Sequence, residues 1–516
     1  MILPRPPLQG PGPELERLAP LLRLMHGMSA DSRRILPRMG FAAYPGEAGD
    51  GRRWIADAVA RGASAVLWEP DGAGSIDASL TVDGEFLPNL PVPGLKAQIS
   101  RIASELYGRP SAHLDVIGVT GTNGKTSTTH WLAYCLARAG VPCALVGTLG
   151  TGMPDALQAT GFTTPGPVEL QQQLAELRTA GARAVAMEVS SHGLAQGRVD
   201  GVRFSHAVFT NLTRDHLDFH GSMEAYGEAK AALFRAKGLR CAVLNLDDAF
   251  GATLFAALQA EGVRCVGTSH AAIGTRPPSS TDIAACHPAA AYQAHAVRFS
   301  TSGTRFLLRG PQGELALETR LIGSFNLSNL LGVIACLSEY GVTWADLPAL
   351  VAQLEAPPGR LQLLGQEGTP QVVVDYAHTP DALEKVLLAL RASVQRGRLI
   401  CVFGCGGDRD PGKRPQMGRI AELHADMTIV TSDNPRSESP EAILQQIAEG
   451  MESAPARMLT DRAAAIDAAI ELAAPGDLVL IAGKGHETTQ EIGGQKLPFS
   501  DIDCARAALA RWKCAR

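Results

Sequence analysis

The chain carries the stretch Gly118-Val119-Thr120-Gly121-Thr122-Asn123-Gly124-Lys125-Thr126, which decides the fold to be expected. Before it stands an apolar run from Leu114 to Val119, typical of a buried strand. After it, apolar residues recur with helical spacing as far as Gly140, a residue type that favours the end of a helix. A glycine-rich turn between strand and helix points backbone N–H groups at a phosphate. The stretch therefore predicts a nucleotide-binding turn in an α/β domain.

Two side chains of this turn suit a nucleoside triphosphate. The Lys125 ammonium would neutralise β- and γ-phosphate oxygens, and the Thr126 hydroxyl is able to hold Mg²⁺. The match to the general pattern G-x-x-x-x-G-K-[ST] is imperfect, since Gly118 stands one residue too early, and a purely structural turn is the alternative. The strand before and the helix after favour nucleotide binding. The residues expected to contact ATP here are Gly121, Thr122, Asn123, Gly124, Lys125, Thr126 and Ser127.

Composition excludes several classes of protein. The 516 residues are enough for about three domains, and 45% apolar with 19% charged residues excludes a largely disordered chain. The formal net charge of −5 provides no basic field for nucleic acid or an anionic membrane. No run approaches the roughly 18 apolar residues of a membrane span, and the first residues lack a secretory pattern. We expect a cytoplasmic protein that binds no nucleic acid and spans no membrane.

Short apolar, β-branched runs recur along the chain, and each ends in a polar or glycine-rich cluster. These runs are Val116–Thr120, Ala184–Val189, Ala207–Thr210, Val372–Val374, Leu399–Phe403, Met427–Thr431 and Leu478–Ala482. Such runs are typical of buried parallel strands, and ligands of open α/β sheets bind beyond the carboxyl ends of the strands. Breaks rich in proline and glycine separate three regions. We expect domains at 1–108, 109–354 and 355–516.

Two groups at these strand ends have the chemistry of a cation or phosphate site. Glu188 ends one run, where a carboxylate is costly to bury unless it is paired or coordinates a cation. It is either a second Mg²⁺ ligand beside Thr126 or an ordinary strand-end carboxylate at the surface. The segment from Asn211 to His220 contains two histidines, two aspartates and an arginine. That density favours a metal or phosphate site over a solvated loop.

In order and spacing, several motifs resemble those of the Mur ligases, ATP-dependent amide-bond-forming enzymes of peptidoglycan assembly. They are the 118–126 stretch, E-V-S-S-H at 188–192, N-L-T-R-D-H-L-D-F-H-G at 211–221 and Y-G-E-A-K-A-A-L-F at 226–234. The early glycine is that family's own form of the turn. D-S-R at 31–33 and D-G-R-R at 50–53 extend the resemblance, whereas 38–43 departs from the commonest family pattern.

The resemblance implies three α/β domains. They would be an N-terminal uridine-nucleotide domain, a central P-loop ATPase-type sheet with helices on both faces, and a C-terminal Rossmann-like domain for the amino acid. It also implies catalytic residues, namely Lys125, Glu188, His216 and Lys230, and anchors for Mg²⁺, namely Thr126, Glu188, His216 and Lys230. Lys230 resembles a lysine that CO₂ converts into a carboxylate-like carbamate, and an unmodified lysine on a solvated helical face is the alternative.

Further contacts follow from the same resemblance. Asn326 and Asn329 resemble residues that contact adenine, Arg360 and Asp375 the pair that meets phosphate and ribose, and His378 a residue near the nucleotide. The uridine end of the acceptor is expected at Ser32 and at the loop of Glu47, Ala48 and Gly49. Its pyrophosphate and sugar are expected at Thr163, Thr164, Ser190, Gln196 and Arg198.

The segment Asp433-Asn434-Pro435-Arg436 resembles the signature of the family members that add meso-diaminopimelate in place of L-lysine. The second stereocentre of diaminopimelate carries an ammonium and a carboxylate. Asp433 is able to accept from the ammonium, and Arg436 to bind the carboxylate through two parallel hydrogen bonds. Arg409, Gly483 and Glu487 match further contacts of this amino acid. A turn without function is the alternative for D-N-P-R alone.

The expected reaction is the ATP-dependent addition of meso-diaminopimelate to the D-Glu carboxylate of UDP-MurNAc-L-Ala-D-Glu. It would pass through an acyl phosphate, use Mg²⁺, release ADP and phosphate, and be carried out by a monomer. One alternative is an L-lysine-adding or other Mur-type ligase, including folylpolyglutamate synthetases. Others are a nucleotide-gated binding protein with a degenerate site, which the full set of catalytic residues disfavours, and a nucleic-acid-dependent NTPase, which the absence of a strong basic stripe disfavours.

Overall fold

The computed structural model describes residues 13–46, 49–72, 81–82, 85–270, 289–300, 302–365, 368–394 and 397–512. Contacts divide the chain into two compact units. Unit 1 holds the described residues up to Gly121, Gly140–Val208 and His216–Ala242. Unit 2 holds Thr122–Ala139, Phe209–Asp215 and the described residues from Val243 onward. The chain therefore passes back and forth between the units, and the nucleotide-binding stretch is divided between them.

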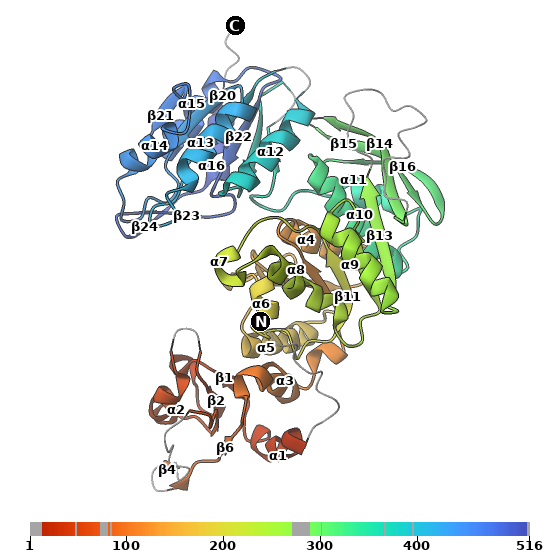
Figure 1. Cartoon of the computed structure of the whole chain (residues 1–516), viewed down its shortest axis with the longest axis vertical. Helices are drawn as coiled ribbons and strands as arrows, with labels where there is room; N and C mark the ends of the chain where they lie inside the picture. The colour runs from red at the N-terminus through yellow and green to blue at the C-terminus, as the bar shows by residue number, and fades with distance from the viewer. Residues whose placement is uncertain are drawn as a thin grey trace. The chain divides into compact units, whose positions relative to one another are not determined.

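Unit 1 begins with a small parallel sheet of strand order β1-β2-β3-β6 (Figure 1). Successive residues face opposite cores, since Ala42 and Leu67 pack with α3, whereas Phe41 and Val66 pack with α2. The elements here are α1 (Pro13–Leu22), β1 (Gly27–Ser29), η1 (Ser32–Arg34), β2 (Met39–Ala43), η2 (Gly51–Trp54), α2 (Ile55–Ala60), β3 (Ala65–Trp68), β4 (Thr81–Val82), β5 (Glu85–Phe86), β6 (Asn89–Pro91), α3 (Leu95–Leu106) and η3 (Pro110–Ala112).

The rest of unit 1 is built on buried parallel strands. β10 pairs in parallel with β7 and with β8, and β8 pairs antiparallel with β9. The elements are β7 (Asp115–Thr120), β8 (Cys143–Gly147), β9 (Gly150–Gly152), α5 (Pro167–Thr179), β10 (Ala184–Glu188), α6 (Ser191–Ala195), β11 (Phe204–Phe209), α7 (Leu217–His220), α8 (Met223–Ala231) and η4 (Ala232–Arg235). The expected runs at 116–120, 184–189 and 207–210 coincide with β7, β10 and the end of β11.

The part of unit 2 before its C-terminal sheet includes four strands in the order β16-β15-β14-β13. The elements that follow unit 1 or return from it are α4 (Lys125–Arg138), β12 (Cys241–Asn245), α9 (Ala249–Ala260), β13 (Cys265–His270), β14 (Tyr292–Ser300), β15 (Gly303–Gly310), β16 (Gly313–Thr319), α10 (Ser324–Glu339) and α11 (Leu347–Ala352). β13 and β14 pair in parallel, whereas β14, β15 and β16 form an antiparallel arm.

The antiparallel arm lies outside the strand pattern expected from sequence. That pattern consists of continuous apolar runs, which detect strands buried on both faces. In β15 and β16 buried residues alternate with partly or fully exposed ones, as in strands with one solvated face. The register pairs Gly310 with Gly313 across a two-residue turn, which only antiparallel neighbours allow. The sheet is therefore mixed.

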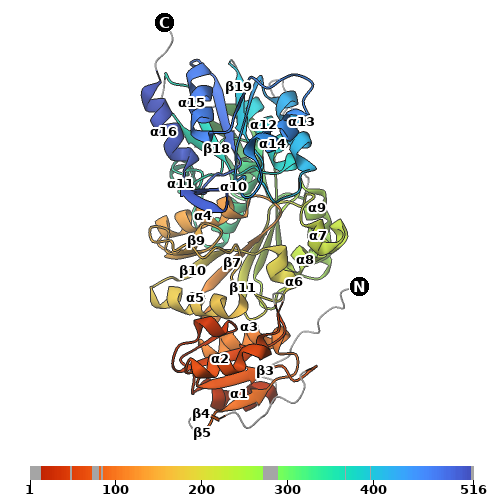
Figure 2. The ribbon, with the colours of Figure 1, turned by 90° about the vertical axis from the view of Figure 1, so that its left-hand side faces the viewer.

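Unit 2 ends in a six-stranded sheet of order β17-β18-β22-β19-β20-β21, in which only β17 pairs antiparallel. Cys401 and Phe403 face a core with α12, α13 and α14, and Ile400 and Val402 face one with α15 and α16. Figure 2 shows these helices on opposite sides of the sheet. The elements are β17 (Gln362–Leu364), β18 (Gln371–Asp375), α12 (Pro380–Ser393), β19 (Leu399–Phe403), α13 (Lys413–His424), β20 (Met427–Thr431), α14 (Pro440–Ala448), β21 (Arg457–Leu459), α15 (Arg462–Leu472), β22 (Leu478–Ala482), β23 (Thr489–Ile492), β24 (Gln495–Pro498) and α16 (Asp501–Arg511).

The α/β class is confirmed. The C-terminal sheet has helices on both faces, an arrangement that was predicted for the central sheet. β19, β20 and β22 match the expected apolar runs residue for residue. Among the described residues, no helix combines the length and apolarity that a membrane crossing requires. The domain limits at 108 and 354 stay predictions.

We predict that Phe403→Ala destabilises the protein by about 3–5 kcal/mol, because Phe403 is fully buried at the end of β19 and its loss leaves a cavity. Urea denaturation measures the free energy of unfolding. Leu423→Ala, on an exposed residue of α13, is the control and should change that free energy by no more than about 0.5 kcal/mol. Equal effects of both substitutions would contradict the assignment of this core.

Candidate active site

Glu188 lies at the carboxyl end of β10 in unit 1 and is only 2% exposed. Its Oε1 accepts from the backbone N–H of Thr148 at 2.8 Å, and its Oε2 accepts from the Thr148 hydroxyl at 3.2 Å. A Cβ at Gly147 would come within 2.4 Å of Oε1, so this position has room only for glycine. Burial excludes the alternative of a surface carboxylate. Glu188 is a fixed, ionisable group at a strand end.

The candidate pyrophosphate and sugar residues form one hydrogen-bonded group around Glu188. Thr164 Oγ1 donates to the carbonyl of Glu188 at 3.0 Å and accepts from the N–H of Ser190 at 3.0 Å. Arg198 donates to the Thr164 carbonyl at 2.9 Å and to Gln196 Oε1 at 2.7 Å. The Thr163 hydroxyl lies 3.0 Å from that of Thr148. Residues distant in sequence are thus brought together at one strand end, as predicted.

His216 and Lys230 belong to a cluster of aromatic rings in unit 1. His216 has φ +52°, a left-handed conformation that strains a residue with a Cβ and recurs at functional sites. Its ring centroid lies 4.7 Å from that of His192. Lys230 is 1% exposed, with Nζ 4.3 Å from the centre of the Tyr226 ring. The alternative of a lysine on a solvated helical face is therefore wrong.

The expected uridine residues follow adjacent strands of the N-terminal sheet. Ser32 is buried after β1, and its hydroxyl hydrogen-bonds to Asp57. Gly49 follows β2 and accepts from the N–H of Gly46 at 2.8 Å. In the part of unit 1 that is described, neither residue hydrogen-bonds to the group around Glu188. Glu47 and Ala48 lie outside the described residues.

The nucleotide-binding turn opens α4 in unit 2. The N–H groups of Thr122 and Asn123 donate to the carbonyl and the side-chain oxygen of Asn211, at 2.8 and 3.0 Å. Lys125 Nζ donates to the Thr122 carbonyl at 2.9 Å and so lies against the turn. Thr126 and Ser127 are buried in the first turn of the helix. The tight strand–turn–helix arrangement predicted from the sequence is confirmed.

The two candidate adenine residues lie on α10. Gly124 has φ +87°, and a Cβ there would lie 2.5 Å from the Asn329 side chain, so this asparagine packs directly against the turn. Asn326 instead donates to the carbonyl of Ile322 at 2.9 Å and is 2% exposed. Asn329 therefore contacts the nucleotide-binding turn, whereas the Asn326 side chain hydrogen-bonds to the backbone just before its own helix.

Arg360, Asp375 and His378 form a second group in unit 2. The Asp375 carboxylate accepts from the N–H groups of Leu361 and Ala377, both at 2.8 Å. Burial raises the pKa of Asp375 above its ordinary value, and the Arg360 charge opposes that rise. The Arg360 guanidinium lies 4.8 Å from the centre of the Tyr376 ring. Within the described residues its Nε is buried without a hydrogen-bond partner, which suits a donor to a phosphate.

The D-N-P-R segment follows β20 and meets the loop after β22. Asn434 Nδ2 donates to Glu487 Oε2 at 2.9 Å, and a Cβ at Gly483 would lie 3.1 Å from Asp433 Oδ2. Arg436 has φ +51° and donates to the Gly407 carbonyl at 2.6 Å. These contacts bring together most of the residues expected to bind the amino acid.

Pro435 and Arg409 complete the expected set. The Pro435 carbonyl lies 2.0 Å from where a Cβ of Gly407 would be. Arg409 is exposed; its guanidinium donates to the Asp408 carbonyl at 3.5 Å, and its side chain approaches Gly406, which also adjoins Arg436.

Several residues of these groups were not predicted. Thr148 holds Glu188, and His192 packs against His216. Lys484 is fully buried beside Asp433 and Glu487. His192 stands inside the motif E-V-S-S-H, and Lys484 stands between the predicted residues Gly483 and Glu487; this adjacency was the available signal. Nothing in the sequence around Thr148 singles it out.

The donor set suits Mg²⁺ only in combination with a ligand. Within the described ranges, no group of three or more His, Cys, Asp or Glu side chains is arranged to hold a metal ion. Mg²⁺ commonly binds through one or two carboxylates together with substrate phosphates and waters. The Glu188 carboxylate in unit 1 and the Thr126 hydroxyl in unit 2 are oxygen donors of the required kind. Each is able to act as one protein ligand of Mg²⁺ that is bound with a nucleotide.

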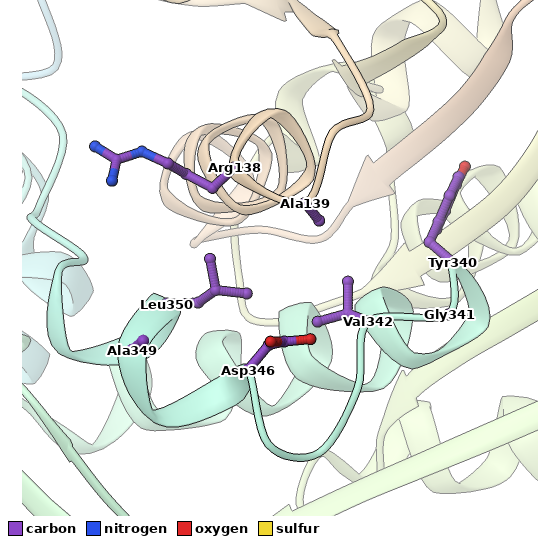
Figure 3. A pocket seen from close by; sticks show the side chains of 8 residues that line it. All are labelled: Arg138, Ala139, Tyr340, Gly341, Val342, Asp346, Ala349 and Leu350. Carbon is purple, nitrogen blue, oxygen red and sulfur yellow. The ribbon is translucent and has the colours of Figure 1, made fainter.

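A cavity of about 330 Å³ lies at the opposite end of α4 from Lys125 (Figure 3). It is lined by Arg138, Ala139, Tyr340, Gly341, Val342, Asp346, Ala349 and Leu350. None of the predicted site residues lines it. The helix separates this cavity from the nucleotide-binding turn by about 20 Å, at 1.5 Å per residue.

Comparison with known proteins extends over nearly the whole chain. Residues 119–337 match the Mur ligase middle domain, 359–485 the Mur ligase glutamate ligase domain, and 24–107 a domain described as Mur ligase family, catalytic domain. A relative from Chromobacterium violaceum, named UDP-N-acetylmuramoyl-L-alanyl-D-glutamate--2,6-diaminopimelate ligase, is 48% identical over 486 residues, or 94% of each chain. These matches confirm the resemblance carried by the motifs.

Solved structures agree with this result. A structure of a UDP-N-acetylmuramoyl-L-alanyl-D-glutamate--2,6-diaminopimelate ligase has a TM-score of 0.67 and 35% identity, and covers 94% of this chain and 95% of that chain. The MurF ligase of Thermotoga maritima in complex with ADP has a TM-score of 0.61 and 17% identity, and covers 95% and 97%. The second match, at low identity, concerns the fold alone.

We predict that His130 on α4 makes stability depend on pH. Burial lowers the pKa of His130 from 6.5 to about 4. The unfolded chain therefore takes up a proton first, so stability is complete above pH 6.5 and falls as the pH drops toward 4, by an order of 2–3 kcal/mol. Urea denaturation across this range should show a shallower decline for His130→Gln than for the wild type. His113→Gln, at an exposed position, is the control. Equal slopes for wild type and His130→Gln would contradict the prediction.

Proposed function

Since the chain belongs to the Mur ligase family, we propose that it is an ATP-dependent ligase that joins meso-diaminopimelate to the D-Glu carboxylate of UDP-MurNAc-L-Ala-D-Glu. The observation that carries this proposal is the amino-acid group after β20 and β22. It contains two carboxylates, Asp433 and Glu487, which meet at Lys484, and the guanidinium of Arg436 from the same D-N-P-R segment, which contacts the Gly407 carbonyl and Glu491. One ammonium and one carboxylate of the second stereocentre of diaminopimelate match these charges. The names of near-full-length relatives support the same substrates.

The first step activates a carboxylate, which is a poor electrophile until it bears a leaving group. Transfer of the ATP γ-phosphoryl to the D-Glu carboxylate forms an acyl phosphate and ADP. Lys125, at the start of α4, would neutralise phosphoryl oxygens, while the N–H groups of the helix start receive the β-phosphate. Bound Mg²⁺ supplies further charge neutralisation, and Thr126, Glu188, His216 and Lys230, if carbamylated, are the residues that would hold it.

The second step forms the amide bond. The amine of diaminopimelate attacks the acyl carbon, the C–O bond to phosphate breaks, and inorganic phosphate leaves. Arg198 and the hydroxyls of Thr163 and Thr164 would hold the acceptor so that its carboxylate stays in place through both steps. Fixing two reactants in one site replaces a bimolecular encounter with an effectively unimolecular step.

The amino-acid group would separate diaminopimelate from L-lysine. Lysine lacks the second carboxylate, so the Arg436 guanidinium would keep only its contact with Glu491, at 3.6 Å, and lose the substrate carboxylate proposed for it. A site built to pair a buried charge rejects analogues that leave that charge unpaired. Arg436 and Asp433 are therefore proposed as the residues that decide the amino acid.

We further propose a cytoplasmic monomer with domains at 1–108, 109–354 and 355–516. In this arrangement each domain would bind one substrate: the first the uridine nucleotide, the second ATP and the third the amino acid. The substrates are water-soluble cell-wall precursors, which is why a cytoplasmic location suits the reaction.

We predict that Lys125→Ala lowers ATP-dependent product formation by roughly 10²–10³, because the charge that stabilises the transferring phosphoryl group is lost. Product is measured by mass spectrometry of the nucleotide-linked tripeptide. Lys96→Ala, at an exposed position of α3, should retain wild-type activity. An active Lys125→Ala variant would refute the proposed role of this lysine.

We predict that Arg436→Met raises the KM for diaminopimelate by about 10- to 100-fold, the value of one or two charged hydrogen bonds. It should also shrink the preference for diaminopimelate over L-lysine, measured as the ratio of kcat/KM values. Arg457→Met, at an exposed position of β21, is the control. A wild-type enzyme that uses L-lysine faster than diaminopimelate would assign the chain to the lysine-adding alternative.

A further inference from the structure

Lys484 is a fully buried ammonium that the proposed reaction does not use. Its side chain is 0% exposed at the carboxyl end of β22. Nζ donates to Asn434 Oδ1 at 2.9 Å and to Glu487 Oε2 at 2.8 Å, and lies 3.7 Å from Asp433 Oδ1. One cation thus contacts three residues of the amino-acid group. A buried ammonium is costly unless its protons and charge are satisfied, and here they are.

The contacts of Lys484 leave Asn434 one orientation. Asn434 Oδ1 accepts from Lys484 and from the N–H of Glu491 at 3.0 Å, while Nδ2 donates to Glu487 at 2.9 Å. Because the oxygen side of the amide faces two donors, reversing the amide would break these bonds. Lys484 and Asn434 together hold Glu487 Oε2, and the Glu487 side chain keeps 32% exposure. The Glu487 carboxylate is therefore held in place by two donors at Oε2, while part of the side chain stays exposed.

A second buried cation lies beneath the same residues. Arg462 and Asp501 form an ion pair at 2.7 Å with both side chains 0% exposed. Arg462 also donates to the carbonyls of Ser432, at 3.1 Å, and Ala482, at 2.9 Å, and so ties the ends of β20 and β22 together. These contacts include three carboxylates, those of Asp433, Glu487 and Asp501, and two cations, Arg462 and Lys484. Arg436 and Glu491, which pair at 3.6 Å, add one charge of each sign, so one carboxylate stays in excess and the group has room for one more positive charge.

We propose that Lys484 is a positioning residue for the amino-acid substrate, and that it holds Glu487, Asn434 and Asp433 in the arrangement that receives the distal ammonium of that substrate. The proposal rests on the proposed function. It assigns Lys484 no contact with substrate, since Nζ lies behind the carboxylates. The positive charge of Lys484 keeps the neighbouring carboxylates of Asp433 and Glu487 ionised and in place, because it offsets their mutual repulsion.

The electrostatics of the group agree with this assignment. Burial alone raises the pKa of Glu487, but hydrogen bonds from Lys484 and Asn434 outweigh burial, so the pKa lies below its ordinary value. Burial raises the pKa of Asp433, and the charges of Arg462 and Lys484 oppose the rise. The other titratable or charged groups that act on these residues are Asp501, Tyr376, His486, Arg360, Arg436 and Glu491. Among the cations named here, Lys484 is the one that hydrogen-bonds to the Glu487 carboxylate.

The test is Lys484→Met, assayed for KM and kcat with diaminopimelate from pH 6 to pH 9. Without the ammonium, the pKa of Glu487 rises, so the carboxylate takes up a proton at acid pH and loses its attraction for an ammonium. We expect the KM for diaminopimelate to rise at least tenfold at pH 6 to 7, with the defect shrinking as the pH rises and Glu487 ionises again. The KM for ATP should stay at its wild-type value.

Two further variants complete the test. Lys96→Met, at an exposed position of α3, is the matched control and should leave every parameter unchanged. Lys484→Gln keeps a hydrogen-bond donor without the charge; it should show the same pH-dependent defect, and it replaces Lys484→Met if that variant does not fold.

The outcomes separate this proposal from the proposed function. A wild-type KM for diaminopimelate in the Lys484 variants overturns the positioning role alone. A defect of equal size at every pH also overturns it, because that result describes a structural lysine. A wild-type enzyme that does not ligate diaminopimelate overturns the proposed function and this inference with it.

Discussion

The structure depends on one constraint: a charge buried at the end of a parallel strand needs an opposite charge or hydrogen-bond partners in direct contact with it. Parallel pairing of β18, β22, β19 and β20 brings their carboxyl ends to one edge of a sheet. The residues that follow are charged and buried, so each needs a partner. Arg462 with Asp501 satisfies this need across elements distant in sequence, and Lys484 satisfies it with Glu487 in its own loop and with Asp433 after β20. The same bonds that neutralise the charges also fix the loops.

Unit 1 meets the constraint differently. Glu188 is buried at a strand end, and its oxygens accept from the backbone N–H and the hydroxyl of Thr148. Glycine at 147 is the steric consequence of that arrangement. We propose the group around Glu188 for a metal with phosphate and the group around Lys484 for an amino acid.

Much of this organisation could be predicted from the sequence, because buried parallel strands are continuous apolar runs and their polar ends stand next to them in the chain. β19, β20 and β22 follow this pattern in every residue. The arm of β14 to β16 does not, since its strands have one solvated face. Lys484 was missed because a lysine beside glycine is exposed in most proteins, and only the tertiary contacts show its burial. Asn329 was expected near the nucleotide from resemblance alone, and its contact with Gly124 has no local sequence signal.

The central claim is that this chain joins an amine to a carboxylate through an acyl phosphate. It is tested most directly by following oxygen from UDP-MurNAc-L-Ala-D-Glu labelled with ¹⁸O in both oxygens of the D-Glu side-chain carboxylate. The substrate is incubated with enzyme, ATP, Mg²⁺ and meso-diaminopimelate, and the released phosphate is analysed by mass spectrometry. The account predicts one ¹⁸O atom in each phosphate and one retained in the amide carbonyl. Unlabelled phosphate formed together with product would contradict it.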